Sequence, residues 1–217
     1  MAEAAQDGQL LLILGDSFVH RLQSCLKQNP APVLDQLKAP MAVSEIFFYG
    51  IGGAGATPST KQLHIPKDLI LALAPKYVIL EIGGNDVDSE ANPEEIAQHK
   101  LTMAKELLGL GVRMVVLTTI LPRDVTRTIP AIHYRAKAES TNNYTSFLVN
   151  EDPQSDHLLF HAHRGFWRDA NHNITDTTSW STDGIHPDTQ SGIAKYRASI
   201  TSAIHKLIKT DRTRFPQ

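Results

Sequence analysis

The sequence has a single cysteine, Cys25, so a disulfide bond within the chain is excluded. It also lacks long hydrophobic runs, and no apolar stretch approaches the roughly 20 residues that a membrane-spanning helix needs. Its acidic and polar start, MAEAAQDGQ, lacks the basic end and apolar core of a secretory signal peptide. These absences lead us to expect an intracellular, cytoplasmic protein without a transmembrane segment.

Runs of lysine or arginine are missing as well, and the formal net charge is -2. Because nucleic-acid-binding domains usually carry a basic patch, we expect no nucleic-acid partner. The 217 residues are 41% hydrophobic and 20% charged, which is typical of a globular protein. We expect a single domain over residues 1–217, with flexible tails at 1–9 and 210–217.

Short apolar runs alternate with longer amphipathic segments along the chain. Because the runs are continuously apolar, they predict strands of a parallel sheet that is covered on both faces. The predicted strands are residues 10–14, 43–50, 77–84, 112–121 and, more weakly, 157–163. The predicted helices are residues 17–28, 60–74, 94–109, 131–149 and 188–208. This alternation predicts a three-layer α/β/α fold.

Short polar motifs follow the predicted strands. GDS (15–17) follows the first strand, GIGGAG (50–55) the second and GGND (83–86) the third, while DGIHP (183–187) comes after the fifth. Open parallel sheets bind ligands at the carboxyl ends of their strands. The four motifs therefore predict one site at that edge of the sheet.

Ser17 and His186 have the chemistry of a nucleophile and its base. A serine hydroxyl needs a base to take its proton, and an imidazole with a pKa of about 6.5 can do so near neutral pH. Asp183 lies three residues before His186, so its carboxylate can orient one ring nitrogen while the other faces Ser17. The chain lacks a G-x-S-x-G elbow, which argues against the ordinary α/β-hydrolase fold.

In these motifs the chain resembles the SGNH hydrolases, also called the GDSL esterase and lipase family. The resemblance spans residues 15–187 and implies a flavodoxin-like sandwich with five parallel strands in the order 2-1-3-4-5. It implies a serine esterase that acts on a small-molecule ester through an acyl-enzyme, without a cofactor or a metal. Family members are mostly esterases, lipases, thioesterases and carbohydrate deacetylases.

The resemblance also assigns roles to individual residues. It makes Ser17, Asp183 and His186 the catalytic residues. Its oxyanion hole consists of the backbone N–H groups of Ser17 and Gly53 and the side-chain amide of Asn85. These assignments agree with the physics, because glycine lets the backbone approach a ligand closely and asparagine is a donor that does not titrate.

Asp16 is expected to support this loop, through Asn85 or through backbone amides. Two stretches, 121–134 and 164–180, could wall the pocket, and Trp167 and Trp180 could line it or pack in the core. Neither stretch is large, so we expect a shallow, open site and short acyl groups.

Two rival functions are compatible with these motifs. A carbohydrate O-acetyl esterase would release acetate from acetylated sugars. A catalytically idle binding module would keep the fold without the activity, as part of a larger retroelement-type protein, because similar domains occur in retroelement-encoded proteins of animals. The intact Ser17, Asn85, Asp183 and His186 argue against the idle module.

Two further patterns predict other kinds of site less well. Gly50, Gly52 and Gly55 satisfy the dinucleotide-binding pattern G-x-G-x-x-G, and Glu81 ends the next strand, but Pro58 follows where a helix should already run. Histidines and aspartates also cluster without any established metal-ligand spacing, so we expect packing or surface roles for them. The members of this cluster are His161, His163, His172, Asp169 and Asp176.

Overall fold

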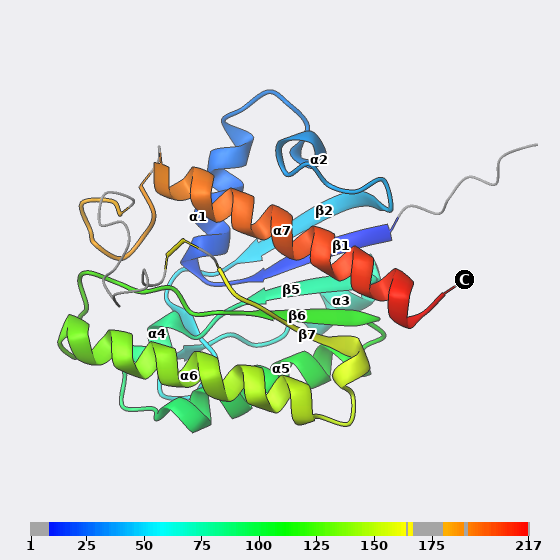
Figure 1. Ribbon diagram of the computed structural model, residues 1–217. Helices are drawn as coiled ribbons and strands as arrows, with labels where there is room; N and C mark the ends of the chain where they lie inside the picture. The colour runs from blue at the N-terminus through cyan, green and yellow to red at the C-terminus, as the bar shows by residue number, and fades with distance from the viewer. Residues whose placement is uncertain (1–8, 164, 167–179, 189–190, 217) are drawn as a thin grey trace, which may run out of the picture.

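The computed structural model describes residues 9–163, 165–166, 180–188 and 191–216. Five parallel strands form the main sheet in the order β2-β1-β5-β6-β7, and helices cover both of its faces (Figure 1). Counted along the main sheet alone, this is the order 2-1-3-4-5. The α/β/α fold and its strand order are therefore confirmed.

The main sheet contains β1 (Gln9–Gly15), β2 (Val43–Gly50), β5 (Tyr77–Glu81), β6 (Met114–Thr118) and β7 (Leu158–His161). Two short strands, β3 (Ala54–Gly55) and β4 (Lys61–Gln62), pair with each other outside it. The helices are α1 (Ser17–Lys27), α2 (Val33–Gln36), α3 (Lys67–Leu73), α4 (Gly84–Val87), α5 (Pro93–Gly109), α6 (Ala131–Glu151) and α7 (Ser191–Arg214). A 3-10 turn, Ser155–His157, precedes β7.

The predicted helix over residues 60–74 is wrong in its first half. Lys61 and Gln62 form β4, and α3 begins only after Pro66. Proline has no backbone N–H and disrupts a helix interior, so a helix through this position is unfavourable, whereas one that begins after it is tolerated. The other predicted helices and strands match observed elements, with differences at their ends.

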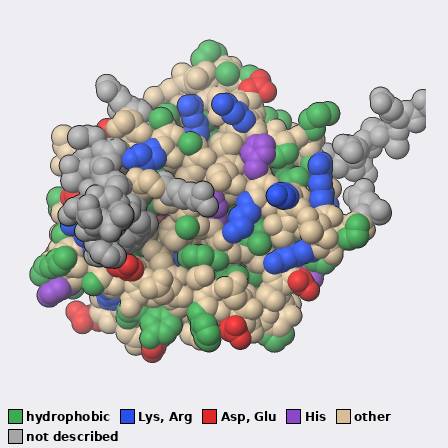
Figure 2. Space-filling view, viewed as in Figure 1, with side chains coloured by type: hydrophobic (Ala, Val, Ile, Leu, Met, Phe, Trp, Pro, Cys, Tyr) green, Lys and Arg blue, Asp and Glu red, His purple; other side chains and the backbone are tan. Residues whose placement is uncertain are grey.

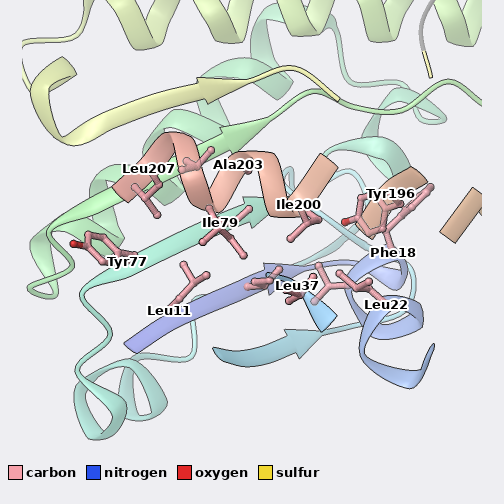
Figure 3. Packing of buried hydrophobic residues seen from close by; sticks show 14 of the residues in the cluster. Leu11, Phe18, Leu22, Leu37, Tyr77, Ile79, Tyr196, Ile200, Ala203 and Leu207 are labelled. Atoms are coloured by element: carbon pink, nitrogen blue, oxygen red, sulfur yellow. The ribbon is translucent and has the colours of Figure 1, made fainter. Parts of the chain in front are cut away.

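Each strand of the main sheet contributes to two hydrophobic layers. Successive side chains of a strand point to opposite faces, so a sheet covered twice needs apolar residues at nearly every position. Figure 3 shows one layer, in which strand residues such as Leu11 and Ile79 share a hydrophobic cluster with Leu22 of α1 and Ile200 of α7. The opposite layer packs residues of α3, α5 and α6 against the alternate strand positions. This explains why the apolar runs of the sequence are continuous.

Charged side chains are spread over the face seen in Figure 2. Lysine and arginine side chains lie over α7 with neutral side chains between them, and most acidic ones lie toward the margin near α5 and α6 (Figures 1 and 2). Within the described ranges, none of the helices combines the length and the hydropathy of a bilayer-crossing segment.

Strand β1 ends in a close contact with β5. A Cβ atom at Gly15 would lie 2.0 Å from the backbone oxygen of Glu81, so only glycine fits there. The next residue, Asp16, donates its N–H to that oxygen over 3.1 Å and accepts the N–H of Phe18 at its carboxylate over 2.9 Å. Asp16 thus caps α1 and makes Ser17 the first residue of the helix. From the sequence, we expected Asp16 to support the loop through Asn85 or through backbone amides. The observed contact with the Phe18 N–H is of the second kind.

The carboxyl group of Asp16 is buried, with 2% of the residue exposed. Burial raises its pKa from 3.8 to about 7; the Phe18 N–H opposes this rise, and the nearby Glu81 carboxylate adds to it. A carboxyl group with a raised pKa binds a proton more tightly in the folded protein than in the unfolded chain. Wild-type stability should therefore fall as the pH rises from about 4 to about 7.

The substitution Asp16→Asn tests this prediction, because asparagine has no proton to lose over that range. The free energy of unfolding of the variant minus that of the wild type should grow between about pH 4 and pH 7 and level off above it. Urea unfolding at a series of pH values measures this difference. The exposed Asp68→Asn is the matched control and should show no such growth, and a constant difference for Asp16→Asn would contradict the prediction.

Candidate active site

The predicted site residues come together at the carboxyl edge of the main sheet. Ser17 follows β1, Gly53 follows β2 and Asn85 follows β5. Asp183 and His186 lie in the segment between β7 and α7, which reaches the same edge (Figure 1). Residues that are up to 169 positions apart in the sequence are thus brought into contact.

The hydroxyl of Ser17, the imidazole of His186 and the carboxylate of Asp183 form a continuous hydrogen-bonded chain. Ser17 Oγ lies 2.7 Å from His186 Nε2, and His186 Nδ1 lies 2.8 Å from Asp183 Oδ2. An ionised carboxylate only accepts hydrogen bonds, so the network places the imidazole proton on Nδ1 and leaves Nε2 to accept from Ser17. This geometry allows proton transfer from Ser17 to His186.

The carboxylate of Asp183 is held by its own turn. Its Oδ1 accepts the backbone N–H groups of Ile185 and His186, each over 2.9 Å, and the hydroxyl of Ser181 over 2.5 Å. Partial burial by itself would raise the pKa of Asp183, but these hydrogen bonds and the one from the His186 ring hold it well below its usual range. Asp183 is therefore ionised at neutral pH.

Backbone contacts close the turn that carries Asp183 and His186. Ser181 donates its N–H to the carbonyl of His186 over 2.8 Å, and Trp180 forms an antiparallel bridge with Pro187. Trp180 is mostly buried and packs beside Phe166, at 6.0 Å between ring centroids. Of the two roles open to Trp180, the structure shows core packing, whereas Trp167 lies outside the described residues.

The imidazole of His186 has a lowered pKa. Its partial burial is the main cause, and the positive charges of Arg21 and Arg123 lower the pKa further, while Asp183 raises it in part. The ring of Phe18 lies 5.4 Å away between centroids and contributes to this shielding. His186 is accordingly neutral, and able to accept a proton, at neutral pH.

Gly53 and Asn85 line one hollow together. Gly53 has a φ of +75°, a left-handed conformation that favours glycine. The Asn85 side chain donates one N–H to the carbonyl of Ala54 over 2.7 Å, and its oxygen accepts from Arg123 over 3.1 Å. These contacts fix the plane of the amide, and the second N–H of its Nδ2 can serve a ligand.

Asp86 joins the Gly53 loop to the Asn85 loop, a role that was not predicted from the sequence. Its buried carboxylate accepts the N–H groups of Ala56 and Thr57, over 2.7 and 2.8 Å, and the hydroxyls of Thr57 and Thr60. The only signal for it in the sequence is its place beside Asn85 in GGND.

The segment after β6 contacts both halves of the site, which the sequence reading also missed. Arg123 hydrogen-bonds to Asn85, and the next two backbone N–H groups, of Asp124 and Val125, donate to the carbonyl of Gly184 over 2.9 and 3.2 Å. One stretch of chain thus holds the amide of Asn85 and the turn that carries Asp183 and His186. From the sequence, we expected only that this stretch could wall the pocket.

A layer of buried polar groups lies behind the site. His163 Nε2 is 2.7 Å from Glu81 Oε2, and the ring nitrogens of His161 and His163 both contact the hydroxyl of Ser199. Burial lowers the pKa of His161 to about 4, so this ring is neutral. Among the described residues no cluster of three or more acidic, histidine or cysteine side chains could hold a metal. His172, Asp169 and Asp176 lie outside the described residues.

The glycines of the dinucleotide-like pattern do not lead into a helix. Gly50 ends β2, Gly55 lies in β3, and β4 follows. A dinucleotide site would instead need a helix whose first N–H groups point at the pyrophosphate.

Comparison with known proteins agrees with this geometry. Residues 13–191 match the GDSL-like Lipase/Acylhydrolase family. Comparison with curated proteins gave no match. Similar solved structures include a GDSL-like lipase from Bacteroides thetaiotaomicron, with 16% sequence identity, a TM-score of 0.61 and coverage of 95% of this chain and 92% of that one.

Two other similar structures are esterases. A carbohydrate esterase family 3 protein from Talaromyces cellulolyticus has 16% identity and a TM-score of 0.59, covering 93% of this chain and 98% of its own. A psychrotrophic esterase from Pseudoalteromonas has 16% identity and a TM-score of 0.58, covering 93% and 99%. At this level of identity the structures show a shared fold. The family match extends over most of the chain, and the protein therefore belongs to the GDSL-like lipase/acylhydrolase family of ester-cleaving serine hydrolases.

Proposed function

We propose that the protein hydrolyses carboxylic esters with short acyl groups through an acyl-enzyme on Ser17. The observation that carries this proposal is the hydrogen-bonded chain from Ser17 through His186 to Asp183. A hydroxyl in contact with a neutral imidazole, which is itself oriented by an ionised carboxylate, is the arrangement that activates a serine nucleophile.

In the first half of the reaction, Ser17 Oγ bonds to the ester carbonyl carbon while its proton passes to His186 Nε2. The carbonyl oxygen becomes an oxyanion. As this intermediate collapses, the bond to the alcohol oxygen breaks, and His186 gives its proton to the departing alcohol. Asp183 stays ionised and stabilises the charged imidazole while the proton resides there.

In the second half, water takes the place of the alcohol. His186 accepts a proton from the water, whose oxygen bonds to the acyl carbon. The bond to Ser17 Oγ then breaks, and the proton returns to Ser17. The products are a carboxylic acid and the free enzyme, so no cofactor is consumed.

The N–H groups of Ser17 and Gly53 and the amide of Asn85 are the proposed donors to the oxyanion. The fixed plane of the Asn85 amide supports this role, because donors that are already oriented do not need to reorganise during the reaction. Arg123 is proposed as a positioning residue that acts through Asn85.

A carbohydrate O-acetyl esterase is the second candidate function. It would use the same reaction steps as the esterase proposed above, but its leaving alcohol would be a sugar. In both cases the alcohol leaves on the side of His186. That side is partly open, since Arg21 beside Asp183 is exposed. Release of acetate from acetylated sugars well above that from aryl acetates would favour this candidate.

Replacing Ser17 by alanine should reduce the hydrolysis of p-nitrophenyl acetate and butyrate at pH 8 by about 10⁴-fold or more, because the nucleophile is lost. Ser24→Ala, an exposed position on the same helix, is the matched control and should retain activity. A serine-directed phosphonate should add its mass to the wild type and to Ser24→Ala only.

Activity that survives in Ser17→Ala would contradict the acyl-enzyme proposal. Absence of both hydrolysis and labelling in the wild type would favour the idle binding module. Faster turnover of long-chain esters than of acetate or butyrate would contradict the expectation of short acyl groups.

Asn85→Ala should lower kcat by about 10²–10³-fold, because one oxyanion donor is removed. Arg123→Met should also lower kcat, by a smaller factor and with little change in KM. The decisive measurement is the double variant: if Arg123 acts through Asn85, adding Arg123→Met to Asn85→Ala should have no further effect on kcat. If the double variant lowered kcat by the product of the two separate factors, the positioning role would be contradicted. Thermal unfolding of each variant shows whether a loss of activity comes from a loss of fold.

The lowered pKa of His186 predicts the pH profile. Because a protonated His186 cannot act as the base, kcat/KM should rise with pH through a midpoint below the ordinary histidine value and then stay level toward neutral pH. Arg21→Ala removes a positive charge that disfavours the imidazolium, so it should move this midpoint to higher pH. Arg21→Lys is the matched control and should keep the wild-type midpoint. A shift to lower pH in Arg21→Ala would contradict this account.

A further inference from the structure

The hollow lined by Gly53 and Asn85 has a volume of about 390 Å³. One water molecule occupies about 30 Å³ of liquid, so a substrate group of several non-hydrogen atoms fits inside. Ser17, Asp183 and His186 do not line this hollow. The nucleophile and the base of the proposed reaction therefore leave it free for another part of the substrate.

The position of the hollow indicates which part of an ester would enter it. In the tetrahedral intermediate, the oxyanion faces Gly53 and Asn85, and the departing oxygen faces His186, which must protonate it. The remaining substituent is the acyl group. A hollow that begins at the oxyanion donors and excludes His186 therefore lies on the acyl side of the substrate.

The residues that line this hollow are polar or charged, apart from Gly53. Among the described residues that line it, none is aliphatic or aromatic; the other lining residues are Ser59, Thr60, Asp88, Ser89, Glu90, Arg127 and Thr128. An alkyl chain that entered would shield these polar side chains from water without giving them hydrogen-bond partners, which costs free energy. A long alkyl chain is therefore a poor occupant.

The polar walls are held in place by buried carboxylates. Asp88 is 8% exposed and accepts the backbone N–H groups of Arg127 and Thr128 over 2.7 and 2.9 Å. Thr60 also lines the hollow, and its hydroxyl donates to the buried Asp86 over 3.0 Å. Preorganised polar groups bind a matching ligand without the entropic cost of ordering them.

Arg127 provides a strong donor at this wall. Its side chain is exposed toward the hollow, and its guanidinium makes no hydrogen bond or ion pair with any described residue. The acidic groups of Glu90 and Asp88 line the same hollow and offset its charge. The walls thus offer donors and acceptors without a net positive field, which suits a neutral polar group better than an anion.

We infer that this hollow is an acyl-binding site that selects neutral acyl groups with hydrogen-bonding oxygen atoms over alkyl chains of the same length. The inference rests on the proposed function, and it specifies the substrate class of that same site. Arg127 and Thr128 are its specificity-determining residues.

Two esters of equal length test the inference. p-Nitrophenyl 3-methoxypropanoate carries an ether oxygen where p-nitrophenyl pentanoate carries its fourth carbon. Hydrolysis of both by hydroxide alone gives the ratio of their intrinsic reactivities. The wild-type ratio of kcat/KM values, methoxypropanoate over pentanoate, should exceed the hydroxide ratio by about fivefold, as one added hydrogen bond allows.

The variant Arg127→Met, Thr128→Val should bring this ratio down to the hydroxide ratio, chiefly through slower turnover of the methoxypropanoate. Both residues are exposed, and Asp88 binds their backbone, which the substitutions leave in place. Arg212→Met, an exposed arginine near the far end of α7, is the matched control and should keep the wild-type ratio.

Each outcome bears on the inference. A wild-type ratio at or below the hydroxide ratio would overturn it, and so would a ratio that the double variant leaves unchanged. These results would leave the proposed function intact, because both esters would still be hydrolysed through Ser17. If Ser17→Ala hydrolysed both esters as fast as the wild type, the proposed function itself would fail, and the inference with it.

Discussion

The close contact between β1 and β5 sets the position of Ser17, and much of the site follows from it. Gly15 lies against the backbone oxygen of Glu81, where a side chain would collide. The N–H of Asp16 then bonds to that same oxygen, and its carboxylate starts α1. The chain turns sharply from strand to helix within one residue, and the hydroxyl of Ser17 emerges beside the loops that follow β2 and β5.

The strands and the motifs that follow them in the chain could be predicted from the sequence, because each depends on local patterns. Continuous apolar runs indicate strands buried on both faces, and GDS, GGND and DGIHP follow where such strands end. The parallel order of the strands then brings Ser17, Asn85 and His186 to one edge. Asp183 was predictable as well, because its link to His186 is local.

The contacts that fix these residues could not be predicted in the same way. Asp86 and Arg123 act across 26 or more positions of sequence, and nothing in their local sequence specifies the partner. The segment at Lys61 has a helical pattern, yet it forms a strand because Gly55 and its neighbour provide a pairing edge. Tertiary contacts decide such cases, and they outweigh local preference.

The buried polar layer behind the site is costly in free energy unless its members are paired. Lys100 donates to the carbonyl of Thr118 over 2.8 Å, and burial lowers its pKa to about 8. Burial by itself would raise the pKa of Glu81, but the contact with His163 lowers it. Such pairs are satisfied only in one arrangement, so they favour a single geometry for the floor of the site.

The two ends of the segment after β6 differ in how they are held. Arg123 to Val125 hold two loops together, so a change there disturbs the amide of Asn85 and the turn at Gly184 at once. Arg127 and Thr128, a few residues further on, donate their backbone N–H groups to Asp88, and their side chains are exposed. If the hollow binds the acyl group as proposed, replacing these two side chains alone would change substrate preference and leave Ser17, His186 and Asp183 in place.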